Sequence, residues 1–530
     1  MTTSDLYDVI TKGKPTSRRE FIKTAAAFGL STAAAMVLFK PIPAKAQPQK
    51  GGILRLGLAT GSVQDSLAPD LLNSATAYII SWSARNSLCE IDNNGELIPE
   101  LAESWDVTPD VKTWTFRIRK GVEFHNGKTM DANDVIHSLN LHRGENTKSA
   151  AKVLLDPVED IKADGNYTVV ITLKEGNADF AYLMSDYRVC IVPAGLTSKD
   201  MAMTAMGTGA YILEDYNPGV SARSRRNPNY WKQGRGHFDG IEFLILPDVV
   251  ARTNALRTGS IDYMNRCDLK TVDFLTKVSN LQIMEVTGNQ HYTLPMDCRI
   301  KPFSDNNIRL ALKYAVDREE LVQKILRGHG EPANDHPIGK GNRYFATDLP
   351  QRRYDPDKAK FYLKKAGMDS LSVAISLSDA AFEGAVDTGI LYHEQAAKAG
   401  IDIRVNRVPA DGYWDNVWMK APWCASYYGG RPTEDWMFSW IYSEGAAWNE
   451  AHWKDDRFNT LLKAARIELD DAKRRGMYEE MQRIVRDEGG SVIPMYANYV
   501  DAAASKLKFD KLAANYPTDG FRGPERWWFA

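Results

Sequence analysis

The sequence predicts an α/β fold from two observations. The first lies in residues 97–140, where Trp114, Phe116 and Ile118 alternate with polar neighbours, which is typical of a strand with one buried face. Asp131 then offers an N-cap to a helix whose apolar residues recur at helical spacing.

The second observation is the order of elements in residues 355–405. A helix is expected to open at Asp355-Pro356, with proline in its first turn, and to run to Ala366 before a glycine. A further helix is expected over 391–400, and a strand over 401–405. Helix, glycine and strand in this order indicate an α/β lobe.

Length and charge limit the class of protein. A chain of 530 residues permits two or three domains, at ~100–200 residues each. The formal net charge of −2 supplies no basic field for nucleic acid, so no nucleic-acid partner is expected.

The N-terminal residues are typical of an export signal. Residues 17–23 closely resemble the twin-arginine motif, and the apolar run over 24–39 is shorter than the ~20 residues that span a bilayer. Ala44 and Ala46 supply the small residues of a signal-peptidase site, so cleavage is expected near Ala46. The alternative is a chance Arg-Arg pair before an ordinary amphipathic helix. No cysteine lies near the cleavage site, so no lipid anchor is expected.

Cysteine spacing argues against zinc or thioredoxin-like chemistry, because no C-x-x-C occurs. An oxidising compartment would permit one or two disulfides, and an odd count leaves at least one thiol unpaired. The five cysteines are Cys89, Cys190, Cys267, Cys298 and Cys424.

Several long motifs resemble those of the extracellular solute-binding proteins of family 5, the peptide, nickel and opine receptors of bacterial ABC importers. Residues 97–105 read LIPELAESW and residues 112–127 read KTWTFRIRKGVEFHNG, close to the family signature. Asn126 stands where the family usually has Asp. Further matching blocks begin at Gly51, Gly207, Tyr292 and Val492, in the family's order, with Ala210 for the usual proline and Asp297 for the usual Asn.

This resemblance implies an α/β, two-lobed periplasmic-binding-protein-like fold of type II, in the large cluster with an extra subdomain. Mixed sheets and a ligand cleft between the lobes are expected. The implied divisions are a twin-arginine signal peptide at 1–46, lobe I at 47–88, 197–284 and 500–530, an inserted subdomain at 89–196, and lobe II at 285–499.

The candidate ligand site is an aromatic-rich stretch. Seven tryptophans lie between Trp414 and Trp453, around a Gly/Pro loop that holds Arg431. Rings supply contact area and fixed charges orient a ligand, although a single tryptophan is more often part of a core. Peptide-binding members of the family often carry an Asp in this loop for the ligand's amino terminus. Arginine instead suits a carboxylate or phosphate, unless it only pairs with a neighbouring acid. The ligand-binding candidates are Arg431, Tyr428, Trp448, Asn449, Glu434, Asp435, Tyr292 and His291.

The resemblance implies the periplasmic substrate-binding component of an ABC importer, which captures a peptide or peptide-like, anionic small solute by lobe closure and delivers it to the inner-membrane permease. A monomer that is not an enzyme, without cofactor or metal, is expected. The alternatives are a secreted hydrolase or a periplasmic chemoreceptor or chaperone-like protein. For a hydrolase, His393-Glu394 lacks the second histidine of a zinc helix and no G-x-S-x-G occurs.

Overall fold

The largest sheet crosses the middle of the molecule. The computed structural model describes residues 48–530, in which Lys50–Phe529 form one unit. The sheet has nine strands in the order β16-β12-β17-β11-β1-β10-β9-β8, with β13 paired to β17. Its strands are β1 (Ile53–Leu58), β8 (Tyr211–Asn217), β9 (Ser221–Arg226), β10 (Gly240–Ile245), β11 (Tyr263–Met264), β12 (Leu281–Pro295), β13 (Gly330–Pro332), β16 (Ser426–Tyr428) and β17 (Ser491–Ala504).

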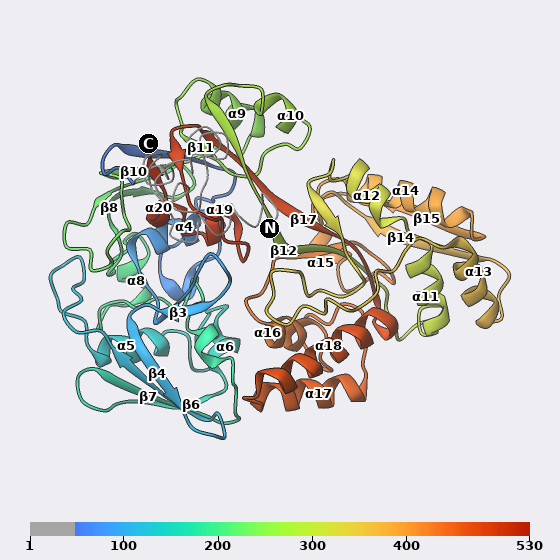
Figure 1. Ribbon diagram of the computed structural model, residues 1–530, viewed down its shortest axis with the longest axis horizontal. Helices are drawn as coiled ribbons and strands as arrows, with labels where there is room; N and C mark the ends of the chain where they lie inside the picture. Colours follow the sequence, from blue (N-terminus) through green and yellow to red (C-terminus); the bar gives the residue numbers. More distant parts are fainter. Residues whose placement is uncertain (1–47) are drawn as a thin grey trace, which may run out of the picture. The chain divides into compact units, whose positions relative to one another are not determined.

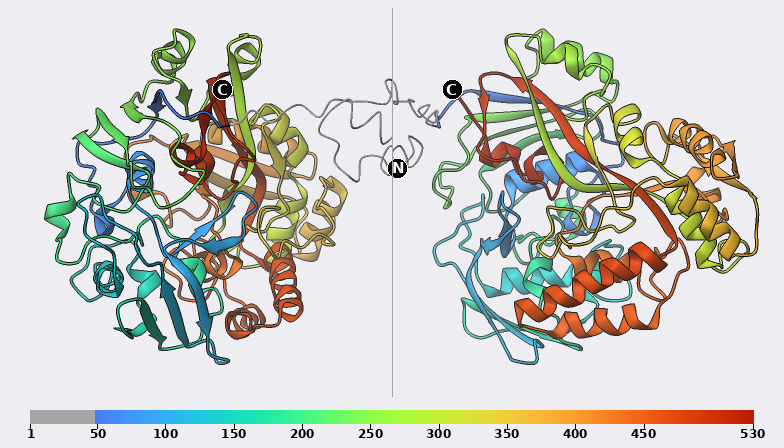
Figure 2. Two further views of the ribbon diagram at one scale, coloured as in Figure 1. Left: turned by 60° about the vertical axis from the view of Figure 1, so that its left-hand side comes forward. Right: turned by 45° about the vertical axis from the view of Figure 1, so that its right-hand side comes forward.

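Two strands of this sheet are much longer than the rest, and they connect the two sides of the molecule (Figure 1). β12 and β17 are antiparallel from the pair Leu281–Ala504 to the pair Pro295–Ser491, and they run side by side in both views of Figure 2. The register shifts between Thr287 and His291, so the ladder is interrupted near its middle. The predicted limits of lobe II, at 285 and 499, fall inside these two strands and stay predictions.

A separate four-stranded sheet, β4-β5-β7-β6, lies within residues 89–196. The predicted buried face of β5 is confirmed, because Trp114, Phe116 and Ile118 are all buried there. Asp131 caps α5 as predicted and forms a capping box with Asp134. The elements of this segment are β2 (Cys89–Ile91), β3 (Leu97–Pro99), β4 (Ala102–Val107), β5 (Thr113–Ile118), α5 (Ala132–Asn140), α6 (Lys152–Leu155), β6 (Val158–Ala163), β7 (Thr168–Leu173) and α7 (Phe180–Leu183).

The region between β12 and β17 contains a parallel pair, β14 and β15, beside helices. The helix expected over 391–400 begins earlier, at Ala385, because Gly384 with φ of 82° turns the chain into it and its first turns are already buried. The elements here are α11 (Asn306–Tyr314), α12 (Arg318–Lys324), α13 (Pro356–Lys365), β14 (Leu371–Leu377), α14 (Ala385–Ala397), β15 (Ile401–Arg407), α15 (Tyr413–Asn416), α16 (Glu434–Ile441), α17 (Asp456–Ile467) and α18 (Asp471–Glu488).

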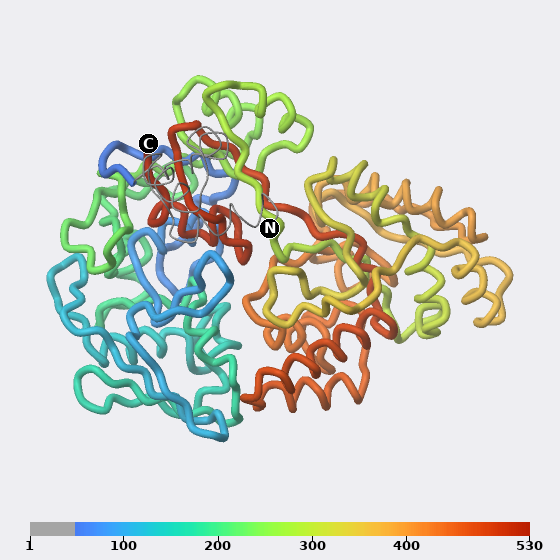
Figure 3. Tube along the Cα trace, in the orientation of Figure 1, coloured from blue at the N-terminus to red at the C-terminus, as the bar shows by residue number. Residues whose placement is uncertain are grey.

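The C-terminal segment returns to the first strand, as the colours of Figure 3 show. Trp527 lies in the same apolar core as Leu54, and Phe529 packs against that core. The remaining elements are η1 (Pro69–Leu71), α4 (Ala75–Ala84), α8 (Ser198–Met201), α9 (Val249–Arg257), α10 (Val272–Leu275), β18 (Leu507–Lys508), α19 (Pro517–Gly520), α20 (Gly523–Arg526) and β19 (Trp528–Phe529).

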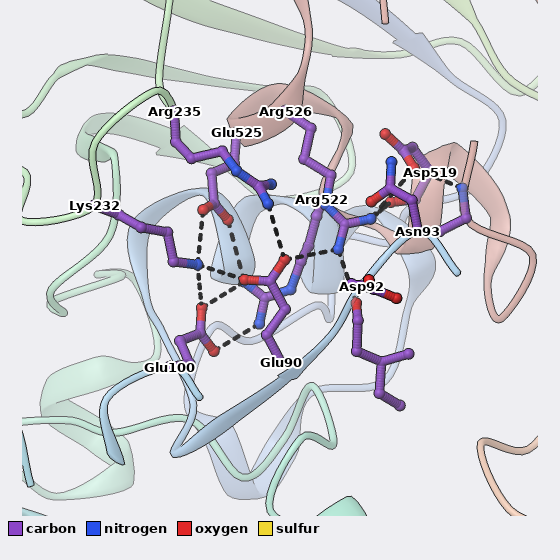
Figure 4. A network of polar contacts seen from close by, with 12 residues as sticks. Glu90, Asp92, Asn93, Glu100, Lys232, Arg235, Asp519, Arg522, Glu525 and Arg526 are labelled. Atoms are coloured by element: carbon purple, nitrogen blue, oxygen red, sulfur yellow. Dashed lines mark hydrogen bonds and ion pairs between the residues drawn. The ribbon is translucent and has the colours of Figure 1, made fainter. Parts of the chain in front are cut away.

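A buried network of ion pairs joins this C-terminal segment to β2 and to Glu100, which follows β3 (Figure 4). Arg522 forms a two-bonded pair with Glu100, at 2.8 and 2.9 Å, and Arg526 pairs with Glu90 at 2.8 Å. Lys232 bridges Glu90 and Glu100 at 2.5 and 2.8 Å. Burial favours the neutral acid, but Lys232 and the arginines outweigh it and hold the pKa of Glu90 well below its usual range.

All five cysteines are free thiols in the structure. In the described part of the chain no helix is long and apolar enough to cross a membrane. Over the same residues, no group of three or more His, Cys, Asp or Glu side chains is arranged to hold a metal ion.

We expect Arg522→Met to lower the free energy of unfolding by about 3–5 kcal/mol, because it removes the two-bonded partner of buried Glu100 and a countercharge of buried Glu525. Urea denaturation followed by circular dichroism measures this. The control is Arg117→Met, whose pair with Asp106 is exposed and whose loss should cost about 1 kcal/mol or less. Equal losses in the two variants would contradict a structural role for the network.

Candidate ligand-binding site

The tryptophans of the aromatic stretch fall into two groups. Trp423, Trp436 and Trp453 are buried in apolar cores. The other group forms a chain of ring contacts with centroid distances between 5.2 and 6.4 Å. This aromatic cluster consists of Trp414, Trp418, Tyr427, Tyr428, Trp440 and Trp448, and Trp414, Tyr427 and Trp448 are exposed.

Arg431 lies against the aromatic cluster. Its guanidinium carbon is 5.2 Å from the centre of the Trp440 ring, a cation–π distance. Its Nη1 donates to the carbonyl oxygens of Gly429 and Gly430, both at 3.1 Å. These bonds connect the side chain to its own loop, and Arg431 stays partly exposed.

The two acids that follow Arg431 point into the protein. Thr433 caps α16, and Glu434 accepts a hydrogen bond from the backbone N–H of Tyr344 at 2.7 Å. Asp435 pairs with Arg466 at 3.0 Å. Burial raises the pKa of both carboxyls, that of Glu434 to about 7. Neither acid is therefore the partner of Arg431.

The other predicted ligand-binding residues precede and follow the Arg431 loop in the sequence. The amide of Asn449 bonds the backbone of Ser443 and Trp453 and so shapes the turn after Trp448. His291 is fully buried between the rings of Tyr428 and Tyr496. Tyr428 donates its hydroxyl hydrogen to the carbonyl oxygen of Trp448 at 3.4 Å. Tyr292 is stacked on Phe382, with ring centres 4.0 Å apart.

A groove of about 570 Å³ lies between residues that precede β12 and residues that follow it. Tyr292 and Tyr427 line it, but Arg431 does not. The loop that holds Arg431 packs beside the groove, because Gly430 lies against Asn289 of β12 and the next residue, Gln290, lines the groove. Charges of both signs border the groove: Arg266, Lys270, Lys324, Arg327, Asp268, Asp379, Glu383 and Asp387.

The structure adds residues that sequence patterns missed. Asp186 and Arg188 flank Tyr187, whose ring contacts that of Tyr516, and the Arg431 loop lies against the preceding residue, Asn515. The only signal for them is an Asp-Tyr-Arg triplet directly before an apolar segment at 189–192. Glu450, under the aromatic cluster, accepts a bond from Trp418, and burial raises its pKa to about 7.

A buried contact joins the segment that contains β4–β7 to the helices after the loop. Asp179 pairs with Arg474 of α18 at 2.8 Å, and both side chains are 5% exposed. The backbone N–H of Ala178 donates to the carbonyl oxygen of Arg466 at 2.8 Å. Trp436 packs into the apolar core of the β4–β7 segment. This contact, here called the cross-contact, holds the two parts together around the Arg431 loop.

Comparisons with known proteins agree on one family. The model for bacterial extracellular solute-binding proteins, family 5, middle region, matches residues 96–450. The chain is 26% identical over 466 residues to the glutathione-binding protein GsiB of Pectobacterium atrosepticum, covering 85% of this chain and 90% of the relative. It is 25% identical over 523 residues to the dipeptide-binding protein of Escherichia coli, covering 87% and 96%.

Solved structures share the fold. The periplasmic binding protein AgaA of A. tumefaciens R10, in complex with agropinic acid, has a TM-score of 0.75 at 23% identity and covers 90% of this chain and 99% of its own. DppA of Helicobacter pylori, in complex with the peptide STSA, has a TM-score of 0.75 at 22% identity, covering 91% and 98%. The predicted periplasmic-binding-protein fold is confirmed.

We expect Asp179→Asn to loosen the cross-contact, because it leaves the buried Arg474 without its countercharge. Small-angle X-ray scattering of the unliganded variant should show a larger radius of gyration while circular dichroism stays native. Asp110→Asn, at an exposed carboxylate of the same segment, is the matched control. A native radius for a folded Asp179→Asn protein would show that the ion pair does not hold these parts together.

The raised pKa of Glu434 predicts a pH dependence of stability. The folded carboxyl titrates at about 7 and the unfolded one at about 4.3, so the folded state retains a proton between these values. This contribution is full below pH ~4 and is lost as pH rises through 7. Relative to Glu434→Gln, wild type should lose about 1–3 kcal/mol between pH 5 and 8 in urea denaturation. Exposed Glu159→Gln is the control; parallel curves for wild type and Glu434→Gln would refute the assignment.

Proposed function

Because the chain belongs to the bacterial extracellular solute-binding proteins of family 5, we propose that it captures a peptide or peptide-like, anionic small solute and delivers it to an inner-membrane ABC permease. The family consists of binding proteins, so no chemistry on the solute is required. Relatives named for glutathione and for dipeptides support a peptide-like guest.

One observation carries the proposal: a groove of about 570 Å³ is lined by Tyr292 of β12, and the loop that holds Arg431 packs against Asn289 of the same strand. Aromatic faces supply contact area with little loss of rotamer entropy, and a guanidinium binds a carboxylate in a two-bonded fork. A solute that touches both sides stabilises the closed arrangement by its greater affinity for it.

The site residues of this proposal are Arg431 with the rings of Tyr428, Trp448 and Tyr292. His291 and Asn449 support them, since His291 packs against Tyr428 and Asn449 shapes the turn after Trp448. Glu434 and Asp435 act from inside the protein, by setting the start of α16. Function as a monomer is also proposed.

The compartment is the periplasm, as for the periplasmic binding proteins that share this fold. Export by the twin-arginine pathway with cleavage near Ala46 is part of the proposal, and the signal lies outside the described residues. Mass determination of the protein recovered from the periplasm tests the cleavage position.

The test uses the solute that copurifies with protein exported to the periplasm, identified by mass spectrometry. Arg431→Ala should weaken its binding in calorimetry about tenfold or more, because a charge-assisted fork is lost. Arg457→Ala, at an exposed pair with Glu480, is the matched control and should bind as wild type. Unchanged affinity in Arg431→Ala would remove Arg431 from the site.

A further inference from the structure

The cross-contact sets an acid against a group of charges that is balanced without it. On the side of α16–α18, Asp435 pairs with Arg466 at 3.0 Å. Glu434 accepts the backbone N–H of Tyr344 at 2.7 Å, and the guanidinium carbon of Arg474 lies 5.5 Å from the centre of the Tyr344 ring. This side therefore supplies two carboxylates and two guanidinium groups, whose charges cancel.

The β4–β7 segment brings a third carboxylate. Asp179 pairs with Arg474 at 2.8 Å, directly after the residue whose backbone N–H bonds the carbonyl oxygen of Arg466. With the cross-contact formed, three carboxylates share two guanidinium groups, so one negative charge is in excess. Within the described chain Glu434 is the acid left without an ion pair, since the two arginines pair with Asp179 and Asp435.

The excess charge lies where water is excluded. Glu434 is 2% exposed, Asp179 4% and Asp435 6%. A buried carboxyl without a countercharge takes up a proton in preference to staying ionised. Burial raises the pKa of Glu434 to about 7, and the Asp179 charge acts in the same direction. Burial also raises the pKa of Asp435, but its partner Arg466 opposes the rise, so the proton belongs on Glu434.

The other groups around the unpaired acid keep their charge states between pH 5 and 8. Burial raises the pKa of Tyr182, Tyr344 and Tyr478, so these hydroxyls stay neutral. Burial opposes the charge of the two paired arginines, but their acids outweigh it and hold the pKa of both above its usual range. The groups that act on Glu434 and its neighbours are Asp435 of α16, Arg466 of α17, Arg474 and Tyr478 of α18, Arg343 and Tyr344, and Asp179 and Tyr182 of the β4–β7 segment.

Opening of the cross-contact reverses the imbalance. When the β4–β7 segment moves away, Asp179 no longer competes for Arg474, whose charge is then available to the two acids of α16. Glu434 meets water and titrates near the ordinary glutamate value of about 4.3. Between about pH 4.3 and 7, the proton is therefore held in the closed arrangement and released on opening.

We propose that the cross-contact is a proton-linked latch: closing takes up one proton on Glu434, so acid favours the closed arrangement and alkali the open one. The stability that this proton gives to the closed arrangement is full below pH ~4 and is lost as pH rises through 7. The consequence for solute binding rests on the proposed function, because a receptor that holds its guest when closed binds it less tightly in alkali.

Pulsed electron paramagnetic resonance on the exported protein, freed of solute by unfolding and refolding in urea, tests the latch. Spin labels at Lys162→Cys of β6 and Lys463→Cys of α17, both exposed positions, report the separation of the two sides. The background carries Cys298→Ser, because the other four native cysteines are buried. In this protein the ratio of short to long distances should fall about tenfold or more between pH 5 and pH 8.

Matched variants separate a latch from a buried acid that takes no part in closing. Glu434→Gln is neutral at every pH, so its distances should be the same at pH 5 and pH 8. Asp179→Asn removes the incoming charge and should also abolish the pH response. Glu159→Gln changes an exposed acid of β6 and should respond as the labelled protein without it. A Glu434 that only stabilised the fold would alter unfolding in urea and leave the distances unresponsive to pH.

Two results would overturn the latch: equal distances at pH 5 and pH 8 without further substitution, or a pH response that persists in Glu434→Gln. Calorimetry with the copurified solute tests the receptor function separately. If the distances respond to pH but no solute binds, the latch stands and the receptor function fails. If the solute binds and the distances do not respond, only the latch fails.

Discussion

The backbone ladder between β12 and β17 is the constraint on which the site depends. Two antiparallel strands carry the chain between the sides of the molecule, and their pairing from Leu281–Ala504 to Pro295–Ser491 fixes how those sides meet. The ladder is interrupted between Thr287 and His291, where the register shifts. A bulge of this kind increases local twist and bends the strand, so β12 bends where it adjoins the groove and the Arg431 loop.

The protein contains buried charged groups that are paired and buried polar atoms that have no partner. At the C-terminal end, the buried charges of Glu90, Glu100, Lys232 and Arg522 pair with one another. At the loop, buried polar atoms such as Oδ2 of Asp186 are left open.

Local pattern predicted the elements well, and it failed where partners are distant in sequence. The alternation of apolar and polar residues predicted the buried face of β5, and Asp131 predicted the start of α5. Proximity in the sequence suggested that Glu434 pairs with Arg431. Glu434 instead accepts a hydrogen bond from Tyr344, ninety residues away.

In the aromatic stretch too, the local sequence does not predict that Trp423 is buried and Trp448 exposed. Asp186 escaped notice because its significance arises only when a distant loop folds against it. Composition therefore indicated the stretch in which the site is proposed, and tertiary packing separated its buried rings from its exposed ones.

The order in which the chain is made gives the C-terminal network a further consequence. Glu90 and Glu100 leave the ribosome hundreds of residues before Arg522 and Arg526, whose guanidinium groups they need once water is excluded. A nascent chain therefore cannot complete this ion-pair network, even after its strands have paired. The native structure of this region forms only after the final residues are made. A chain truncated before them would leave these carboxylates unpaired and be recognised as incomplete by cellular quality control.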